Sequence, residues 1–199
     1  AVLRFTGGTA TQTINNLRNS NSETNMAFFK SIEVDKSSGK VTWGDAGSVL
    51  NISNSLEIKN GTFEVPSTND INGRSFNGTD EAYPTITIQS GGTFDMLGGA
   101  SHIAARAVPL TLNKIGKVTI SGTMNVGSTS TNRIRFGDVD IEDGGTFRLL
   151  IATWAAQGFE PGTINIKNGG TLRYSTTSSS LWENNTVLNL ESGGFVNVT

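Results

Sequence analysis

Six copies of one short phrase organise the hydrophobic pattern of this chain: two apolar residues with one residue between them, a polar pair, glycine, and a second alternating apolar pair. Alternation with period two places successive side chains on opposite faces of a strand, so each copy predicts a strand, a tight turn and a second strand. Glycine supplies the positive φ that such a turn needs. The copies are Leu56–Val65, Ile86–Met96, Val118–Val126, Val139–Leu149, Ile164–Tyr174 and Leu188–Val198.

The spacing of the copies predicts how they assemble. Their first apolar residues are separated by 30, 32, 21, 25 and 24 positions, which is typical of the coils of a β-solenoid. A two-stranded unit cannot bury its own apolar face, so neighbouring copies must stack in parallel, about 4.8 Å apart, around a shared interior. The predicted fold class is therefore all-β: a single-stranded parallel β-helix of about seven to eight coils, with 1–199 as one array.

Degenerate copies precede the six regular ones. One begins at Ile32, turns at Gly39 and returns through Trp43, and a weaker one begins at Leu3. We therefore assign residues 1–55 to irregular N-terminal coils and residues 56–199 to regular coils.

Three segments interrupt the regular pattern: 66–85, 97–117 and 150–163. The first is polar and rich in turn residues and predicts a protruding loop. The other two contain small apolar runs that can pack back onto the solenoid wall. Loops on a rigid scaffold frequently carry recognition, so these segments are the first places to look for function.

Stacking in register predicts columns of side chains along the solenoid axis. Outside, charges of alternating sign would help to fix the register, with Asp35 over Lys59, and with Glu142, Lys167 and Glu191 in succession. Inside, full burial of each apolar side chain is worth about 1.5–3 kcal/mol. The expected inward column contains Phe63, Phe94, Met124, Phe147 and Leu172.

Composition narrows the classes of partner. Charged residues make up 16% of the 199 residues and the formal net charge is -2, so there is no basic field for nucleic acid or an anionic membrane surface. No apolar run is long enough to span a bilayer. With no cysteine and a single histidine, His102, a disulfide framework and a multi-histidine zinc site are both excluded. Neither nucleic acid nor membrane insertion is expected.

The densest acidic cluster lies at Asp138, Asp140 and Glu142, which alternation places on one outer face. Parallel β-helices include polysaccharide lyases and glycosidases that use clustered carboxylates for acid-base chemistry or calcium binding. These three residues are the candidate calcium ligands. The favoured interpretation is a solvated acidic strand beside Lys167, because no other coil contributes carboxylates to that column. We therefore expect no catalytic residue and no cofactor.

The outward column of the return strands brings like charges together twice, Glu64 beside Asp95 and Arg148 beside Arg173. Each pair is unfavourable at the strand spacing. A cation at the first pair, or an anionic group at the second, would relieve the repulsion, and so would screening by salt. Arg148 and Arg173 are therefore candidate ligand-binding residues.

The three tryptophans differ in their positions. Trp43 falls on the inward alternation and is expected in the core. Trp154 and Trp182 lie in connections, where an indole can stack on a sugar or anchor a loop by burial. Both are kept as candidates for contacting a ligand or partner.

The N-terminal motifs carry a resemblance. Leu3–Ile14 reads LRFTGGTATQTI, Phe29–Gly39 reads FKSIEVDKSSG, and both precede the run of Gly-Thr-Phe phrases. This combination resembles the repeat regions of very large Bacteroidota cell-surface proteins. The resemblance implies a secreted or surface-anchored adhesin, exported by type IX secretion and of the gliding-motility kind. Passenger domains of autotransporters are similar in their physics and are the second choice.

The expected function is that of a non-catalytic extracellular scaffold module in adhesion, part of a larger cell-surface or secreted protein. The alternatives are a self-assembling filament subunit and a carbohydrate-binding or polysaccharide-degrading β-helix protein. Val196–Thr199 stops in mid-strand without a polar cap. The expected partners are therefore other segments of the same large protein or identical chains stacked end to end, and surface glycans.

Overall fold

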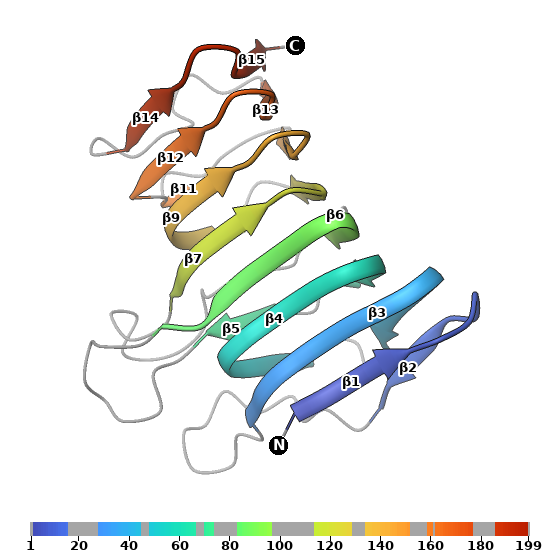
Figure 1. Ribbon diagram of the computed structural model, residues 1–199. Helices are drawn as coiled ribbons and strands as arrows, with labels where there is room; N and C mark the ends of the chain where they lie inside the picture. The colour runs from blue at the N-terminus through green and yellow to red at the C-terminus, as the bar shows by residue number, and fades with distance from the viewer. Residues whose placement is uncertain are drawn as a thin grey trace.

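The computed structural model confirms the predicted fold class. It describes residues 2–15, 28–44, 48–66, 70–73, 83–96, 114–128, 134–151, 159–160, 162–176 and 186–198. All regular elements within them are strands, and they join in one 15-stranded sheet in which the neighbouring strands pair in parallel. The coils stack along a single axis, with the N-terminal coil at one end and the C-terminal coil at the other (Figure 1).

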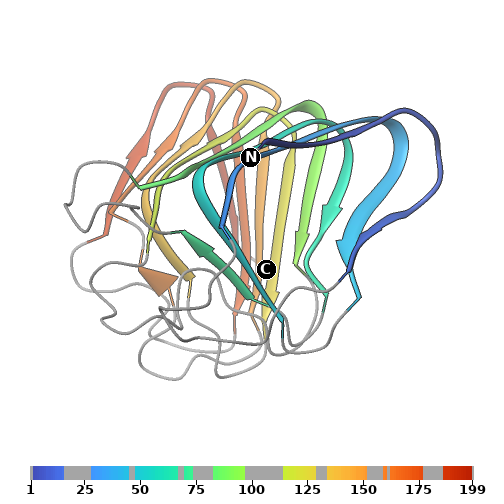
Figure 2. The same ribbon diagram turned by 90° about the horizontal axis from the view of Figure 1, so that it is seen from below.

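The strands form three walls that are visible when the solenoid is viewed along its axis (Figure 2). Wall A carries the first strand of each sequence copy and wall B carries the return strand. Wall A contains β1 (Val2–Thr6), the middle of β3 (Phe28–Trp43) and of β4 (Val49–Glu64), the first half of β6 (Thr85–Met96), β7 (Ile115–Ile120), β9 (Ile134–Ile141), β12 (Thr163–Ile166) and β14 (Val187–Leu190). Wall B contains β2 (Gln12–Ile14), the ends of β3, β4 and β6, β8 (Thr123–Ser128), β10 (Thr146–Ile151), β13 (Thr171–Thr176) and β15 (Phe195–Val198).

Wall C is shorter. It contains the starts of β3, β4 and β9, together with β5 (Asp70–Gly73) and β11 (Phe159–Glu160). In the described part of the chain, wall C has strands from about five turns. The number of turns with all three sides is thus slightly below the seven to eight coils that the spacing predicts.

Registered pairing on wall B produces the predicted inward column. Phe63 pairs with Phe94, and the column continues through Met124 to Phe147. All of these side chains are fully buried. Trp43, which was expected in the core, lies there with its ring centroid 5.5 Å from that of Phe63, and the Phe63 and Phe94 rings stack at 6.1 Å.

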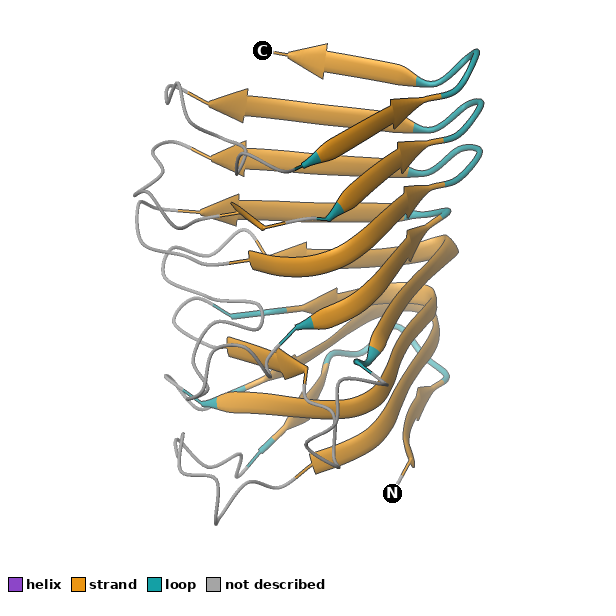
Figure 3. Ribbon diagram, turned by 90° about the vertical axis from the view of Figure 1, so that its left-hand side faces the viewer, coloured by secondary structure: helices purple, strands orange, loops and turns teal. Residues whose placement is uncertain are grey.

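The turns between walls A and B lie one above another along one side of the molecule (Figure 3). Their paired glycines serve two different purposes. Gly169 has φ of 79°, which favours glycine. Gly170 lies outside the left-handed region, but a Cβ there would collide with the carbonyl oxygen of Ile141 in the preceding coil. The sequence pattern predicts positive φ at the glycines of this turn, whereas Gly170 instead permits the coils to approach closely.

One segment predicted as a loop contains a strand. Within 66–85, β5 pairs with the start of β4, and Ile71 is fully buried against the core. In the segments 97–117 and 150–163, the described strands β7, β10 and β11 also extend into the range assigned to loops. A single apolar residue such as Ile71, flanked by polar turn formers, is too short a signal for alternation to predict a strand.

Candidate functional site

The acidic group of wall A is arranged as predicted on the outer face. Val139 and Ile141 are buried, while Asp138 is exposed and Glu142 is half-buried. Asp140, between them, is only 9% exposed. The pairing of β9 with its neighbours on both sides therefore determines what these carboxylates contact.

Both carboxylate oxygens of Asp140 are engaged by neighbouring coils. Lys117 Nζ of β7 lies 2.7 Å from Asp140 Oδ2, and Asn165 Nδ2 of β12 donates to Asp140 Oδ1 at 2.6 Å. Asn189 in turn donates to Asn165 Oδ1 at 2.8 Å. The result is a chain of polar contacts across four successive coils of wall A. The sequence pointed to Lys167 as the neighbouring cation, but Lys117, one coil earlier, is the lysine that bonds Asp140.

The electrostatics of Asp140 reflect this arrangement. Burial raises its pKa, but the hydrogen bonds from Lys117 and Asn165 and the nearby positive charges outweigh burial, so the pKa is lowered overall. The same contact raises the pKa of Lys117, first through its hydrogen bond to Asp140 and then through the charge of Asp140. Among the described residues, no group of three or more His, Asp or Glu side chains is placed to hold a metal ion.

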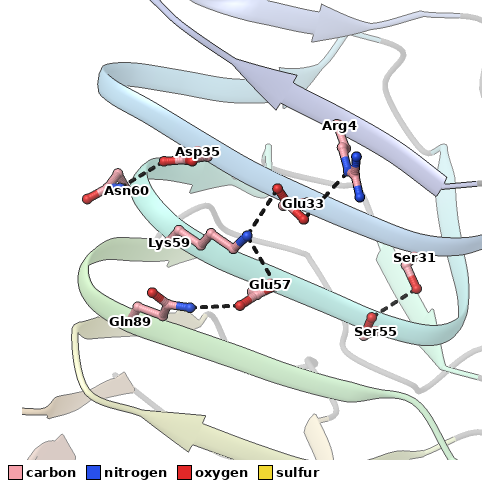
Figure 4. A network of polar contacts seen from close by, with 9 residues as sticks. All are labelled: Arg4, Ser31, Glu33, Asp35, Ser55, Glu57, Lys59, Asn60 and Gln89. Atoms are coloured by element: carbon pink, nitrogen blue, oxygen red, sulfur yellow. Dashed lines mark hydrogen bonds and ion pairs between the residues drawn. The ribbon is translucent and has the colours of Figure 1, made fainter.

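The N-terminal half of wall A carries a second network of polar contacts, shown in Figure 4. The expected pair of Asp35 and Lys59 does not form. A bulge shifts the register so that Asp35 pairs with Asn60, whose Nδ2 donates to Asp35 Oδ1 at 2.8 Å. Lys59 Nζ instead lies 3.1 Å from Glu33 Oε1 and 3.9 Å from Glu57 Oε2. The bulge cannot be seen in the sequence because the alternation on either side of it is intact.

The expected charge succession at the C-terminal turns is present in part. Lys167 Nζ lies 3.1 Å from Glu191 Oε1. The pKa of Lys167 is raised, first by its hydrogen bond to Glu191 and then by the charge of Glu191, with smaller contributions from Asp140 and Glu142. Glu142 therefore acts on Lys167 through its charge.

The outward column of wall B has the predicted order. Glu64 pairs with Asp95, Asp95 with Asn125 and Asn125 with Arg148. Sequence reasoning missed Lys40, whose Nζ lies 2.8 Å from Glu64 Oε2 and 3.0 Å from Glu64 Oε1. Lys40 comes from the preceding coil and lies 24 positions away in the chain, so the register of β3 on β4 was needed to find it.

Asp95 is the member of that column whose ionised form is disfavoured by its surroundings. Burial, followed by the charge of Glu64, raises its pKa, while the hydrogen bond from Asn125 and the charge of Lys40 oppose the shift. The Oδ1 atoms of both Asp95 and Asn125 are buried without a hydrogen-bond partner. A cation at this point would compete with Lys40, which already neutralises Glu64.

Arg148 and Arg173 are brought together as predicted, because they are register partners on β10 and β13. Arg148 is half-buried and Arg173 is exposed. Two other candidate residues, Trp154 and Trp182, lie outside the described residues, as does His102.

A buried lysine was not anticipated. Lys36 is 2% exposed, and its Nζ donates to Gly7 O at 3.1 Å and to Gln12 Oε1 at 2.9 Å. Gln12 occupies an inward position of wall B, in register with Val41. A polar residue at an otherwise apolar inward position was the signal in the sequence. The buried lysine thus bonds two exposed residues of the first described coil.

The opposite end of the solenoid is apolar. Five of the six large hydrophobic side chains of β14 and β15 are exposed at the terminal edge of the solenoid. They are Val187 (50%), Leu188 (46%), Leu190 (56%), Phe195 (58%) and Val198 (60%). In the described ranges, no helix is long and apolar enough to cross a membrane.

No protein-family model matches this chain, and no curated protein matches it. A solved structure titled as the TibC-catalyzed hyper-glycosylated TibA55-350 fragment aligns with 100% of this chain and 92% of that chain, at 11% identity and a TM-score of 0.17. At that TM-score the likeness carries no argument about this chain.

Proposed function

We propose that this chain is a non-catalytic scaffold module, a rigid β-solenoid that holds other segments or ligands in place. The observation that carries the proposal is that lysines of wall A form ion pairs with carboxylates of neighbouring coils. Lys59 bonds Glu33, Lys117 bonds Asp140 and Lys167 bonds Glu191, each across neighbouring coils.

The core supports the same role. A continuous inward column of aromatic and aliphatic side chains runs through the described coils, and each buried side chain contributes about 1.5–3 kcal/mol. Such a molecule behaves as a quasi-one-dimensional rod in which each coil contacts its neighbours. Rigidity along the axis is what a stalk or display scaffold requires.

The proposed setting is extracellular. The motifs at Leu3–Ile14 and Phe29–Gly39 that resemble Bacteroidota surface proteins support a role in adhesion at the cell surface, with export by type IX secretion. A passenger domain of an autotransporter is the second choice. Labelling intact cells of the source organism with an antibody against the purified chain tests this, and exclusively internal labelling would contradict it.

Catalysis is tested by exposing the purified chain to a panel of acidic and neutral polysaccharides and measuring new reducing ends. We expect no turnover by the wild-type chain. Turnover that disappears in the variant D138N/D140N/E142Q would replace the scaffold role with a polysaccharide-degrading enzyme centred on wall A. The matched control is the variant E33Q/E57Q, which removes carboxylates from the same wall.

Head-to-tail stacking of identical chains is a second candidate, favoured by the exposed apolar edge of β14 and β15. Parallel strand pairing there would cover Leu188 and Leu190 and satisfy unpaired backbone groups. We expect sedimentation analysis to show self-association that weakens in the variant L188S/L190S. The variant T87S/T119S, altered on the outer face of wall A, is the control. A monomer at high concentration rejects this candidate.

A further inference from the structure

Arg148 and Arg173 lie side by side on the outer surface of wall B. Because they are register partners on parallel strands, their backbones are one strand spacing apart, about 4.8 Å. Their chain neighbours Phe147, Leu149 and Leu172 are fully buried. Alternation therefore directs both guanidinium groups away from the core.

These arginines are not neutralised by the described part of the chain. Neither has an ion pair or hydrogen bond to another described residue. The acid in the same column, Asp95, is separated from Arg148 by Asn125. Two strand spacings amount to about 10 Å, which is close to the Debye length at physiological ionic strength, so Asp95 compensates the arginines weakly. The ion-paired lysines of wall A contrast with this pair.

Hydroxyl and amide groups surround the arginine pair. In the next outward column, Thr146 pairs with Thr171. In the column of the arginines themselves, Asn125 precedes them and Asn197 follows them. These side chains donate and accept hydrogen bonds. We call the six residues Asn125, Thr146, Arg148, Thr171, Arg173 and Asn197 the arginine strip.

We propose that the arginine strip binds an acidic polysaccharide, a sugar chain that carries carboxylate or sulfate groups. The planar guanidinium fork matches such groups in bidentate geometry, and two forks held at the strand spacing meet successive anionic groups of a chain lying along the axis. The amide of Asn197 and the hydroxyls of Thr146 and Thr171, which are half-buried, are suited to sugar hydroxyls. Nucleic acid is disfavoured because two cations on a chain of net charge -2 neutralise few phosphates.

This inference adds a ligand to the proposed scaffold and rests on that role only in requiring that the sugar be held without cleavage. The test is isothermal titration of the wild-type chain with oligogalacturonate, sulfated dextran oligosaccharide and neutral dextran. We expect binding of at least one acidic oligosaccharide and none of neutral dextran. Binding is expected to weaken as salt is added, because the contacts are charged.

The double variant R148Q/R173Q is expected to bind the acidic oligosaccharide at least about tenfold more weakly, since it loses both charge-assisted contacts. The matched control is R4Q/K30Q, which removes the same charge from exposed side chains away from wall B. It is expected to retain affinity within about twofold. Thermal unfolding of each variant confirms that the fold is intact.

Three results would overturn the inference: no binding of either acidic oligosaccharide by the wild-type chain, equal loss of affinity in the two double variants, or binding of polyphosphate or single-stranded DNA in preference to the acidic sugars. Cleavage of a bound oligosaccharide would instead reject the non-catalytic function and leave the binding site standing. The failures of the two proposals are thus distinguishable.

Discussion

At Asp140, burial and hydrogen bonding act in opposite directions on one carboxyl group. The lowered pKa means that Asp140 adds stability above its unfolded pKa, near the ordinary value of 3.8, and that this stability is lost as the pH falls through the folded pKa. The residue therefore joins coils while it is ionised. Its ion pair with Lys117 depends on that charge.

Substitution D140N is expected to lower the free energy of unfolding at neutral pH by about 1 kcal/mol, because the ion pair with Lys117 is lost. The difference from wild type should shrink as the pH falls below the folded pKa of Asp140, where the wild-type carboxyl is also neutral. Urea unfolding across the acidic range measures it. A difference that is constant with pH would show that the charge of Asp140 is not the cause.

Asp95 presents the opposite case. Its raised pKa means that the folded chain binds the proton more tightly than the unfolded chain, so stability falls as the pH rises between the two pKa values. Substitution D95N is expected to raise the unfolding midpoint at neutral pH, since the amide carries no charge beside Glu64 and can donate to the unpartnered Asn125 Oδ1. A lower midpoint for D95N in thermal unfolding would contradict this account.

Two glycines of neighbouring turns allow the cost of a strained backbone conformation to be compared with the cost of a steric collision. At Gly144, φ is 72° and a Cβ would meet nothing within 4 Å, so G144A is expected to cost about 1 kcal/mol of stability. At Gly170 a Cβ would collide with the backbone of the preceding coil, and G170A is expected to cost more, about 2–3 kcal/mol. Urea unfolding of the two variants compares them, and equal costs would refute the distinction.

At the scale of the strand, the return strands of wall B carry the core. The side chain of Phe94 is fully buried between Phe63 and Met124. Substitution F94A is expected to reduce the free energy of unfolding by about 3–5 kcal/mol, through lost burial and the cavity left behind. Its neighbour Thr93 points outward, and T93A should remain within about 0.5 kcal/mol of wild type. Similar losses in both variants would contradict the inward column.

The strands also show what the sequence could and could not predict. Alternation and the glycine offset were enough to place Phe63, Phe94 and Met124 in one column, because parallel pairing repeats the same geometry in each coil. The bulge at Lys59 was invisible, since it inserts a residue without disturbing the flanking pattern. The contacts of Lys40 and Lys117 could not be predicted without knowing the register between coils of unequal length.

At the scale of the whole molecule, the predicted parallel β-solenoid is confirmed, while the number of complete turns is slightly lower than predicted. Wall C accounts for the difference, because its described strands come from about five turns, whereas walls A and B have a strand in each sequence copy. The sequence predicted only part of the arginine strip. Arg148 and Arg173 were found from their shared offset, whereas the lack of an ion pair between either arginine and another described residue could be seen only from the neighbouring coils.

Coils that touch only their neighbours also make the molecule extensible in steps. A force applied between the first and last described coils acts along the hydrogen bonds that join them and loads all the interfaces at once. An end coil, which has a neighbour on one side only, detaches first. Each step would release 21 to 32 residues, the spacing of the copies, or roughly 70–110 Å of extended chain. Under tension the rod would dissipate energy in steps as successive coils unfold, while its remaining coils stay folded.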